Sequence, residues 1–408
     1  MRYCSRTDTS RPRSEKKSFP ADIIVMIVGI DNITPGTSTS STLSVGSMRP
    51  YVQDLLLGLP ALFPNWQFKF FTPAWNEPFE VAHRNVEVVT CGQSPRNRPG
   101  RIWFEQTRLP RIIADEKIDI WLGTCNYLPL RATCKTVLLV LSHQFFTHPE
   151  AYGRVRRAWL RWVVTRSVRL ADRVGVQCED AKKTLRRYID VPERSLSVVY
   201  HRPATTNRDR PSDPETDAAA IGKILGRKRP YILYVSAFYP FKNHPRLIEA
   251  FSRIRRDFPD LALILAGGNG EGRTADGLRA EAIRRNIGAD VFFTGHTPPA
   301  ALAILYRNAQ LAVFPSLEET FGLPVIEAMS FGCPVVTSNR SSMAEIAGDA
   351  ARLVDPENIE SIAAGMTDLL SSETLRHSLI RKGRARSGFF TKERTLEGVA
   401  EALKSVAA

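Results

Sequence analysis

The 408-residue sequence has no apolar run near the roughly 18 residues that a membrane-spanning helix needs. Its first twenty residues lack an apolar core followed by a small-residue cleavage site, so we do not expect a secretory signal. The six cysteines form no Cys-x-x-Cys pair, and the seven histidines show no His-Glu-x-x-His spacing. We therefore expect a cytoplasmic protein with reduced thiols, no disulfide framework and no structural metal.

Acidic residues are scarce relative to basic ones. Lys and Arg number 56 against 42 Asp and Glu, which gives a net charge of +14. Such an excess is typical of proteins that meet nucleic acid, an anionic membrane surface or an anionic substrate, and composition does not decide among these. The sequence is otherwise that of a globular protein, 43% hydrophobic and 24% charged, with a length that suits two domains.

The most informative stretch is a predicted strand, loop and helix in the last third of the chain. Residues 311–314 form an apolar run short enough for a buried strand, and residues 325–331 are predicted as a helix. The loop between them brings the helix N-terminus to the carboxyl edge of a sheet, where free N–H groups and the helix dipole favour phosphate. Glu319 in the loop and Glu327 in the helix can accept hydrogen bonds from adjacent hydroxyls of a sugar or ribose.

Residues 314–356 resemble the C-terminal signature of retaining glycosyltransferases of family 4, which have the GT-B fold. The matching pieces are the Glu-x7-Glu pair around Phe-Gly-Leu-Pro, then Gly-Cys-Pro-Val-Val-Thr-Ser and Leu-Val-Asp-Pro. The resemblance implies that Glu319 holds the donor sugar and that Glu327 holds the nucleotide ribose. It also implies a donor site at the four residues that directly follow Glu319, which are Thr320, Phe321, Gly322 and Leu323.

Weaker matches lie elsewhere in the predicted donor domain. The resemblance gives Lys242 a catalytic role beside Glu319, because the family has a cation there that neutralises the donor diphosphate. Ser236-Ala237 replaces the family's Gly-Arg, so the second cation is missing, and Ser236 remains a donor-binding candidate. Gly295 ends a predicted strand that we expect to border the nucleotide base.

Two candidates lie in the first half of the chain. Gly46, followed by Ser47, replaces a Gly-Gly pair of the family in a loop near the donor phosphates, between a predicted strand at 23–30 and a helix from Tyr51. His143 follows a predicted strand at 137–141 and matches a family histidine that faces the reaction centre. A lone histidine is more often structural than catalytic, so both interpretations of His143 stay open despite the family match.

Alternating strands and helices predict an α/β chain of two facing Rossmann-like domains with a C-terminal crossover helix. The predicted parts are a disordered basic arm (1–20), an acceptor-binding domain (21–203), a linker (204–229), a nucleotide-sugar-binding domain (230–390) and a helix that packs back on the first domain (391–408).

A predicted helix from Tyr152 to Val174 is rich in arginine and tryptophan. These residues are Arg154, Arg156, Arg157, Arg161, Arg166, Arg169, Trp159 and Trp162. A packed helix with a solvated basic face is the ordinary explanation. The alternative is a helix that lies on anionic headgroups at the inner face of the cytoplasmic membrane, beside a lipid-linked acceptor.

The resemblance implies a metal-independent, retaining transfer of a hexosyl unit, with mannose as the first expectation. The donor would be a GDP- or UDP-linked sugar, the acceptor a saccharide or lipid-linked saccharide of envelope, lipopolysaccharide or capsule synthesis, and no further cofactor is expected. Two alternatives remain: a sugar-nucleotide epimerase or phosphorylase on the same fold, and a non-catalytic basic protein that binds membrane or nucleic acid. No aromatic-interleaved basic module is present, so we expect no nucleic acid.

Overall fold

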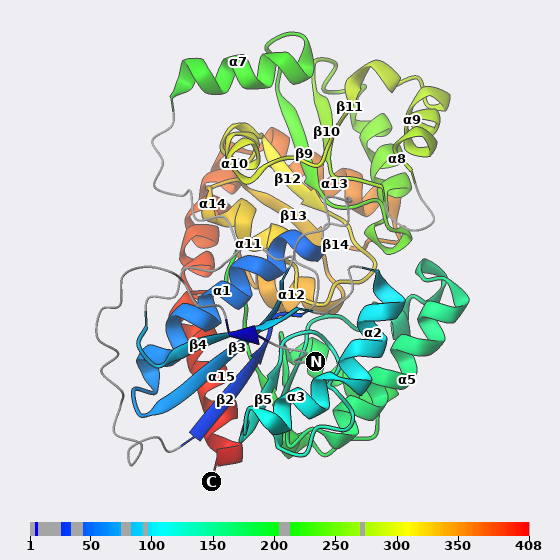
Figure 1. The fold of residues 1–408 in the computed structure, drawn as a ribbon. Helices are drawn as coiled ribbons and strands as arrows, with labels where there is room; N and C mark the ends of the chain where they lie inside the picture. The colour runs from blue at the N-terminus through cyan, green and yellow to red at the C-terminus, as the bar shows by residue number, and fades with distance from the viewer. Residues whose placement is uncertain are drawn as a thin grey trace.

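The computed structural model describes residues 5–6, 26–33, 44–74, 83–92, 97–203, 213–269 and 274–407. Two sheets of mostly parallel strands, each flanked by helices, form two domains that face one another (Figure 1). The predicted α/β architecture of two Rossmann-like domains is confirmed.

The first sheet has the strand order β1-β4-β3-β2-β5-β6-β7-β8, and only β1 runs antiparallel to its neighbour. The chain builds outward from β2 in one direction and then resumes at β5 in the other. Ligands bind such sheets at this switch point, outside the carboxyl ends of the strands. The strands are β1 (Ser5–Arg6), β2 (Met26–Asp31), β3 (Trp66–Pro73), β4 (Val86–Cys91), β5 (Ile120–Gly123), β6 (Lys135–Val140), β7 (Arg173–Val176) and β8 (Leu196–Val198).

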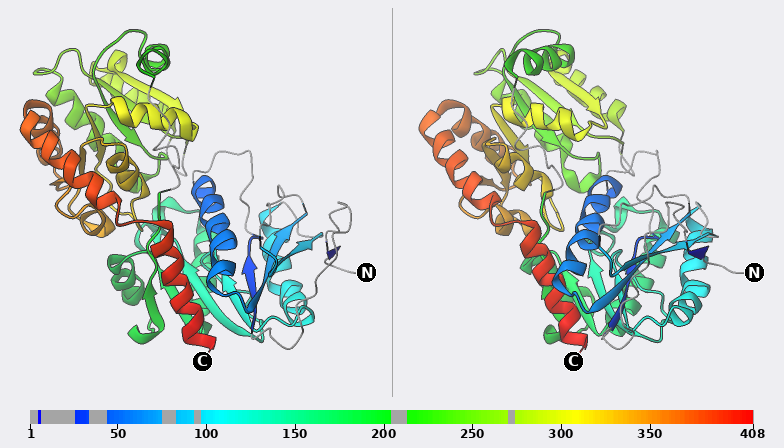
Figure 2. Two further views of the ribbon diagram at one scale, coloured as in Figure 1. Left: turned by 90° about the vertical axis from the view of Figure 1, so that its left-hand side faces the viewer. Right: turned by 60° about the vertical axis from the view of Figure 1, so that its left-hand side comes forward.

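Both faces of the first sheet are covered, as its continuously apolar strands require. In β6, Val137 and Leu139 enter one core cluster, whereas Leu138 and Val140 enter the other. One face packs against α1 (Ser44–Leu62) and α15 (Lys392–Ala407), so the end of the chain returns to the first domain (Figure 2). The other face packs against α2 (Arg98–Thr107), α3 (Leu109–Asp115), α5 (Arg154–Leu170) and α6 (Glu179–Tyr188).

The second sheet has the order β11-β10-β9-β12-β13-β14, with its switch point between β9 and β12. Its strands are β9 (Tyr231–Val235), β10 (Ala262–Ala266), β11 (Val291–Gly295), β12 (Leu311–Phe314), β13 (Val335–Ser338) and β14 (Arg352–Val354). Its helices are α7 (Pro214–Leu225), α8 (His244–Ile254), α9 (Ala275–Arg284), α10 (Pro299–Asn308), α11 (Leu323–Ser330), α12 (Ser341–Ala347), α13 (Ile359–Ser371) and α14 (Glu373–Ser387). The strand predicted at 311–314 is β12.

An aromatic cluster joins the two domains where the chain passes between them. Phe321, which follows β12, and Phe390, which follows α14, belong to the core cluster of the first domain. Their ring centroids are 5.7 Å apart, and the Phe321 ring lies 5.8 Å from His201. His201 stacks on Tyr51 of α1 with the centroids 4.0 Å apart, and burial lowers its pKa to about 3. Buried aromatic rings therefore connect the two domains in this arrangement.

The structure corrects one local prediction and leaves others untested. Helix α1 begins at Ser44 rather than at Tyr51, so Gly46 lies in the first turn of a helix and not in a turn before it. Of the predicted basic arm (1–20), only Ser5–Arg6 are described, paired with Thr90 and Val89. The predicted linker (204–229) contains α7, and residues 204–212 lie outside the described part. Among the described residues, no helix is long and apolar enough to cross a membrane.

Candidate active site

The candidate donor site lies at the switch point of the second sheet. Strands β9 and β12 are hydrogen-bonded neighbours, and their following loops carry Lys242 and Glu319 respectively. Because parallel strands end at one edge, residues that are 77 positions apart in sequence meet there. The topology therefore places two of the three predicted catalytic residues together at the edge where ligands bind such sheets.

Glu319 and Lys242 form a short ion pair through Oε1 and Nζ. Their side chains are only 12% and 16% exposed. The hydroxyl of Ser316 also donates to Glu319 Oε1, at 3.3 Å. The backbone of Glu319 is fixed on both sides, because its N–H donates to Ser341 Oγ at 3.1 Å and its carbonyl accepts from Ser342 Oγ at 2.9 Å. The carboxylate is thus held in one place, with a cation as its immediate neighbour.

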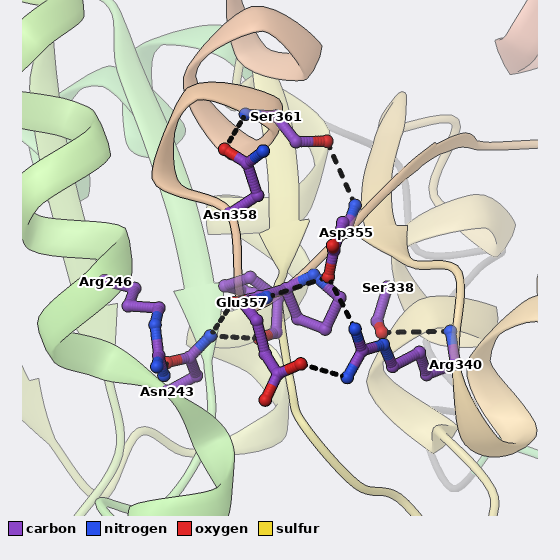
Figure 3. Close-up of polar contacts among 10 residues, drawn as sticks. Asn243, Arg246, Ser338, Arg340, Asp355, Glu357, Asn358 and Ser361 are labelled. Carbon is purple, nitrogen blue, oxygen red and sulfur yellow. Dashed lines mark hydrogen bonds and ion pairs between the residues drawn. The ribbon is translucent and has the colours of Figure 1, made fainter.

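Asn243 holds the Lys242 loop against the Glu319 loop. Its side-chain amide donates to the carbonyl of Pro315, at 2.9 Å, and to that of Pro356, at 2.6 Å. Figure 3 shows Asn243 between Arg246, which donates to its Oδ1 at 3.1 Å, and the chain that leads to Glu357. The loops after β9, β12 and β14 are therefore tied together by one buried amide. This role of Asn243 was not predicted from the sequence, where it is noted only as the neighbour of Lys242.

Gly322 allows the loop to enter α11. It precedes the first helical residue with φ +102°, a left-handed conformation that favours glycine. A Cβ atom there would lie 2.9 Å from Met343 Sδ, so a side chain would also be crowded. Leu323 and Pro324 then start the helix, and proline is favoured here because it has no N–H to leave unpaired. The free N–H groups of this first turn, together with the dipole, suit an anion.

Glu327 lies in α11, on the same loop-and-helix unit as Glu319. Tyr306 of α10 donates to its Oε2 at 3.5 Å, and the same hydroxyl lies 3.5 Å from the carbonyl of Pro324. Burial, followed by the nearby Glu327 carboxylate, holds the pKa of Tyr306 well above its usual range, so the phenol stays a donor. Tyr306 therefore orients Glu327, the carboxylate that the resemblance implies will hold the nucleotide ribose.

The hydroxyl of Thr320 is buried and has no hydrogen-bond partner among the described residues. Thr320 is 5% exposed and lies between Glu319 and Phe321 in the predicted donor loop. A buried hydroxyl without a partner costs about 1–3 kcal/mol. A sugar or phosphate oxygen in the donor site would remove that cost.

We expect Thr320→Val to separate stability from donor binding. Valine has the shape of threonine without the hydroxyl, so the unliganded variant should gain about 1 kcal/mol in free energy of unfolding and lose roughly fivefold to tenfold in donor affinity. Chemical denaturation and titration calorimetry measure the two effects. The control is Thr337→Val, because Thr337 Oγ1 donates to the carbonyl of Phe314 at 3.1 Å and its loss should destabilise the protein. Equal destabilisation by both variants would contradict a ligand role for Thr320.

Ser236 and Gly295 meet through Gly267. Ser236 N–H donates to the carbonyl of Ala266 at 2.9 Å, and Gly267 forms an isolated bridge with Gly295. Ser236 is buried, and its hydroxyl donates to the carbonyl of Ala237 at 3.0 Å. The loops after β9, β10 and β11 are thus side by side at the edge where a nucleotide would lie. Ala237, which stands where the family has Arg, is also buried.

Phe321 and Gly46, two of the predicted donor-binding residues, are placed differently from the others. The Phe321 side chain is 3% exposed and packs in the interdomain aromatic cluster, so only its backbone is left for a donor. Gly46 lies near the start of α1, and that end of the helix points toward the second domain (Figures 1 and 2). A helix N-terminus there presents free N–H groups toward the second domain.

His143 lies across the domain interface from the donor loop. It follows β6, is 1% exposed, and its Nε2 lies 2.9 Å from Glu318 Oε1. Glu318 directly precedes Glu319, so two consecutive carboxylates have different partners in different domains. The structure therefore brings His143 to the same loop as Glu319 and Lys242, through a residue that the sequence had not singled out.

The switch point of the first sheet carries a buried polar cluster that the sequence did not reveal. Asp31 ends β2, and the hydroxyl of Thr124, after β5, donates to its carbonyl at 2.7 Å. Arg101 and Glu105, one turn apart on α2, form an ion pair of 3.3 Å, and Tyr127 donates to Glu105 at 2.7 Å. The signal in the sequence was only an aspartate after an apolar strand and an Arg–Glu pair at helical spacing.

The two carboxylates of this cluster share one guanidinium. Burial raises the pKa of Glu105 to about 7 and that of Asp31 to about 6, against the opposing effect of Arg101. Since the pair is buried with a single cation, it retains a proton near neutral pH. A cluster that carries a proton and lies at a sheet's switch point can both donate and accept hydrogen bonds to a hydroxylated ligand.

We expect Glu105→Gln to change how stability depends on pH. Because the pKa of Glu105 is higher in the folded chain than the ordinary 4.5, its contribution to stability is fully present below pH 4.5 and is lost as the pH rises through about 7. The difference in unfolding free energy between wild type and Glu105→Gln should therefore change by about 3 kcal/mol between pH 4.5 and 8, in favour of the variant at high pH. Urea denaturation across this range measures it, with exposed Glu401→Gln as control. Parallel curves for wild type and Glu105→Gln would show that Glu105 is ionised throughout.

No group of three or more His, Cys, Asp or Glu side chains that could hold a metal occurs in the part of the chain that the structure describes. The predicted cation of the donor site is a lysine instead.

Two family models match the chain. "Glycosyl transferases group 1" matches residues 220–386, and "Glycosyltransferase Family 4" matches residues 49–201. An O-antigen chain mannosyltransferase B of Escherichia coli is 28% identical over 286 residues, which are 69% of this chain and 73% of that protein. A D-inositol 3-phosphate glycosyltransferase of Segniliparus rotundus is 31% identical over 193 residues, which are 47% of this chain and 42% of that protein.

The fold of the whole chain is similar to solved structures. A sucrose-phosphate synthase from Thermosynechococcus elongatus superimposes with a TM-score of 0.72 at 21% identity, over 93% of this chain and 98% of that one. At this identity the likeness concerns the fold alone.

Proposed function

Because the chain belongs to the family 4-like glycosyltransferases of the GT-B fold, we propose that it transfers a hexosyl unit from a nucleotide diphosphate sugar to a hydroxyl group with retention at the anomeric carbon. The observation that carries this proposal is the Glu319–Lys242 ion pair at the switch point of the second sheet, beside the N-terminus of α11. A carboxylate for sugar hydroxyls and a cation for the diphosphate are the two groups that such a donor needs.

In the proposed donor complex, Lys242 exchanges its ion pair with Glu319 for one with the donor diphosphate. The diphosphate carries more negative charge than one carboxylate, so Lys242 turns to it, and Glu319 becomes free to accept hydrogen bonds from the sugar. The N–H groups at the start of α11 bind the same diphosphate. Glu327, oriented by Tyr306, accepts from the ribose hydroxyls. No metal ion or further cofactor is part of this proposal, because lysine and helix N-terminus supply the positive charge.

The proposed chemistry takes place on one face of the sugar. The bond between the anomeric carbon and the diphosphate oxygen breaks, while the acceptor oxygen forms its bond to that carbon from the same side. The departing phosphate oxygen takes the proton of the acceptor hydroxyl. Lys242 and the helix N–H groups stabilise the charge that develops on the diphosphate. Glu319 orients the sugar and stabilises its positive charge, and no enzymatic nucleophile is needed.

The acceptor is proposed to lie at the switch point of the first sheet, facing His143 and the Asp31–Glu105 cluster. A hydroxylated acceptor suits a cluster that donates and accepts hydrogen bonds. Mannose as the transferred sugar and an envelope polysaccharide or its lipid-linked precursor as the acceptor are supported by the similarity to the O-antigen chain mannosyltransferase. The base of the donor is proposed to be guanine or uracil.

A panel of nucleotide sugars tests the proposal directly. Thermal stabilisation and slow hydrolysis are measured with GDP-mannose, UDP-glucose and UDP-galactose. We expect one of them to stabilise wild type but not Glu327→Ala, and to be transferred or hydrolysed by wild type but not by Glu319→Ala. If none of a broad panel binds, or if Glu319→Ala keeps full turnover, the assignment of the donor site is wrong.

Helix α5 is proposed to bind an anionic membrane surface. On its outward side, the side chains of Val155 and Trp162 are 86% and 54% exposed to solvent. Exposed arginines, which include Arg161 and Arg166, lie on the same helix. Exposed apolar side chains between cations suit a headgroup layer.

We expect the protein to cosediment with vesicles that contain anionic lipid, and to be released by high salt. Replacing Trp162 with Ala and Arg161 with Ser should weaken binding roughly tenfold, since each basic residue near such a surface contributes about 1 kcal/mol. The matched control is Ile283→Ala on the other domain, because Ile283 is also an exposed apolar residue. Equal binding to neutral and anionic vesicles would leave α5 as an ordinary packed helix.

A further inference from the structure

Glu318 reaches from the donor loop into the other domain. Its Oε1 lies 2.9 Å from His143 Nε2, and its side chain is 16% exposed against 1% for the histidine. The resemblance to family 4 gives roles to Glu319 and Glu327 but none to Glu318. The next residue, Glu319, has a different partner, Lys242. Two adjacent carboxylates are therefore divided between the histidine of one domain and the lysine of the other.

Hydrogen bonds within its own domain fix the backbone around His143. Asn126 Oδ1 accepts from Leu141 N–H at 2.7 Å and from Ser142 N–H at 2.9 Å, which sets the chain just before the histidine. The carbonyl of His143 accepts from Phe146 N–H at 2.8 Å. In the part of the chain that the structure describes, the side chain that hydrogen-bonds to the imidazole is Glu318, and this contact requires that the two domains face each other.

The surroundings of the ring add a second acid. The pKa of Asp180, in the first turn of α6, is raised first by burial and then by the Glu318 carboxylate, and the nearby His143 opposes this rise. Two carboxyl groups and one imidazole thus share the interface. A carboxylate can only accept a hydrogen bond, so the proton of this contact belongs to the histidine Nε2. In the neutral ring, Nδ1 is then the acceptor.

We infer that Glu318 is the positioning residue of His143: it fixes the ring and its Nε2–H tautomer, and it does so only when the domains have closed. The inference rests on the proposed function, in which His143 faces the reaction centre. It ties the assembly of that centre to domain closure, because the histidine comes from the acceptor domain and the carboxylate from the donor loop. Where a carboxylate orients a metal-binding histidine, its removal lowers activity about 10–100-fold. We expect an effect of this size when Glu318 is removed.

A rival explanation is that Glu318 merely holds the domains together. Glu345 supplies the control, because it makes another interdomain contact, to backbone N–H groups of α6 rather than to the His143 ring. Its two carboxylate oxygens accept from the N–H groups of Glu179 and Asp180 at the start of α6, at 3.0 and 2.8 Å. Glu345→Ala should therefore loosen the interface without releasing the histidine ring.

The test combines a direct readout of the ring with kinetics. The protein is labelled with 15N-histidine, and the resonances of His143 are assigned by their loss in His143→Ala. We expect the Nε2–H tautomer in wild type, Glu318→Gln and Glu345→Ala, and a mixture of tautomers in Glu318→Ala. This readout does not depend on turnover. A mixture in wild type, or an unchanged Nε2–H tautomer in Glu318→Ala, would overturn the inference even if the enzyme is a glycosyltransferase.

The kinetic arm uses the nucleotide sugar that wild type turns over best in the panel of GDP-mannose, UDP-glucose and UDP-galactose. We expect Glu318→Ala to lower kcat about 10–100-fold with donor KM changed less than about twofold. Glu318→Gln, whose amide oxygen still accepts from Nε2–H, should restore most of the loss. The double variant Glu318→Ala/His143→Ala should be no slower than His143→Ala alone.

Several kinetic results would refute this role. If the two substitutions had additive effects on kcat in the double variant, Glu318 would not act through His143. An equal loss of kcat in Glu345→Ala would show that any weakened interface has this effect, so that Glu318 holds only the domains. If wild type turns over no nucleotide sugar at all, the proposed function fails, and the tautomer measurement still decides whether Glu318 positions the ring.

Discussion

Replacing Lys242 with alanine is expected to lower kcat for nucleotide-sugar turnover by about two to three orders of magnitude. The departing diphosphate gains negative charge in the transition state, and a preorganised donor or cation at such a position is worth about 10²–10³ in rate. The site has one such lysine, and the position of the second family cation is the buried Ala237. Because position 237 holds no arginine that could also neutralise the diphosphate, the loss of kcat should be larger than in an enzyme that has both cations.

The same substitution has a second consequence that identifies its cause. Lys242 is the ion-pair partner of Glu319, whose side chain is 12% exposed. Lys242→Ala therefore leaves a largely buried carboxylate without its cation. Donor affinity should therefore fall less than kcat, because Glu319 is already free for the sugar hydroxyls when Lys242 is absent. Calorimetric titration with the donor and steady-state kinetics separate the two quantities.

Suitable controls exist on the same chain. Lys242→Arg keeps the charge and should retain part of the rate, although the guanidinium cannot reproduce the geometry of a single ammonium. Lys228→Ala removes an exposed lysine from the loop before β9 and should leave turnover at the wild-type level. A Lys242→Ala enzyme with kcat within about threefold of wild type would show that another group stabilises the leaving diphosphate.

The parts of the site that are local in sequence could be predicted from it. Strand β12, the loop with Glu319, and α11 with Glu327 follow one another within twenty residues, and each carries its own signal: an apolar run, a glycine and proline, and helical spacing. These local predictions required only chain order and the period of each element. The role of Lys242 beside Glu319 came instead from the resemblance to family 4, because chain order alone does not make β9 and β12 neighbours.

Contacts between distant segments could not be predicted in the same way. Glu318 and His143 are 175 positions apart and belong to different domains, so no spacing relates them. The cluster of Asp31, Arg101 and Glu105 requires that α2 pack over the carboxyl end of β2, which depends on tertiary packing. The start of α1 was misplaced because Gly46 and Pro50 are poor helix formers in an isolated chain, and packing overrides that preference.

Replacing Gly267 with alanine is expected to destabilise the second domain by about 3 kcal/mol. A Cβ atom on Gly267 would lie 1.8 Å from the carbonyl oxygen of Ser236 and 2.6 Å from its carbonyl carbon. Both are backbone atoms, so the clash cannot be relieved by turning a side chain. The loops after β9 and β10 would have to separate, and the bridge from Gly267 to Gly295 would be lost.

The expected loss is both of stability and of donor binding, because the displaced loop carries Ser236 and leads to Lys242. Urea denaturation gives the stability, and thermal stabilisation by the nucleotide sugar gives the binding. Gly222→Ala is the matched control: a Cβ atom there meets nothing within 4 Å, and in helix α7 alanine should add about 0.5–1 kcal/mol. If Gly267→Ala were as stable as wild type and bound donor equally well, the loops after β9 and β10 could not lie as close together as the proposed donor site requires.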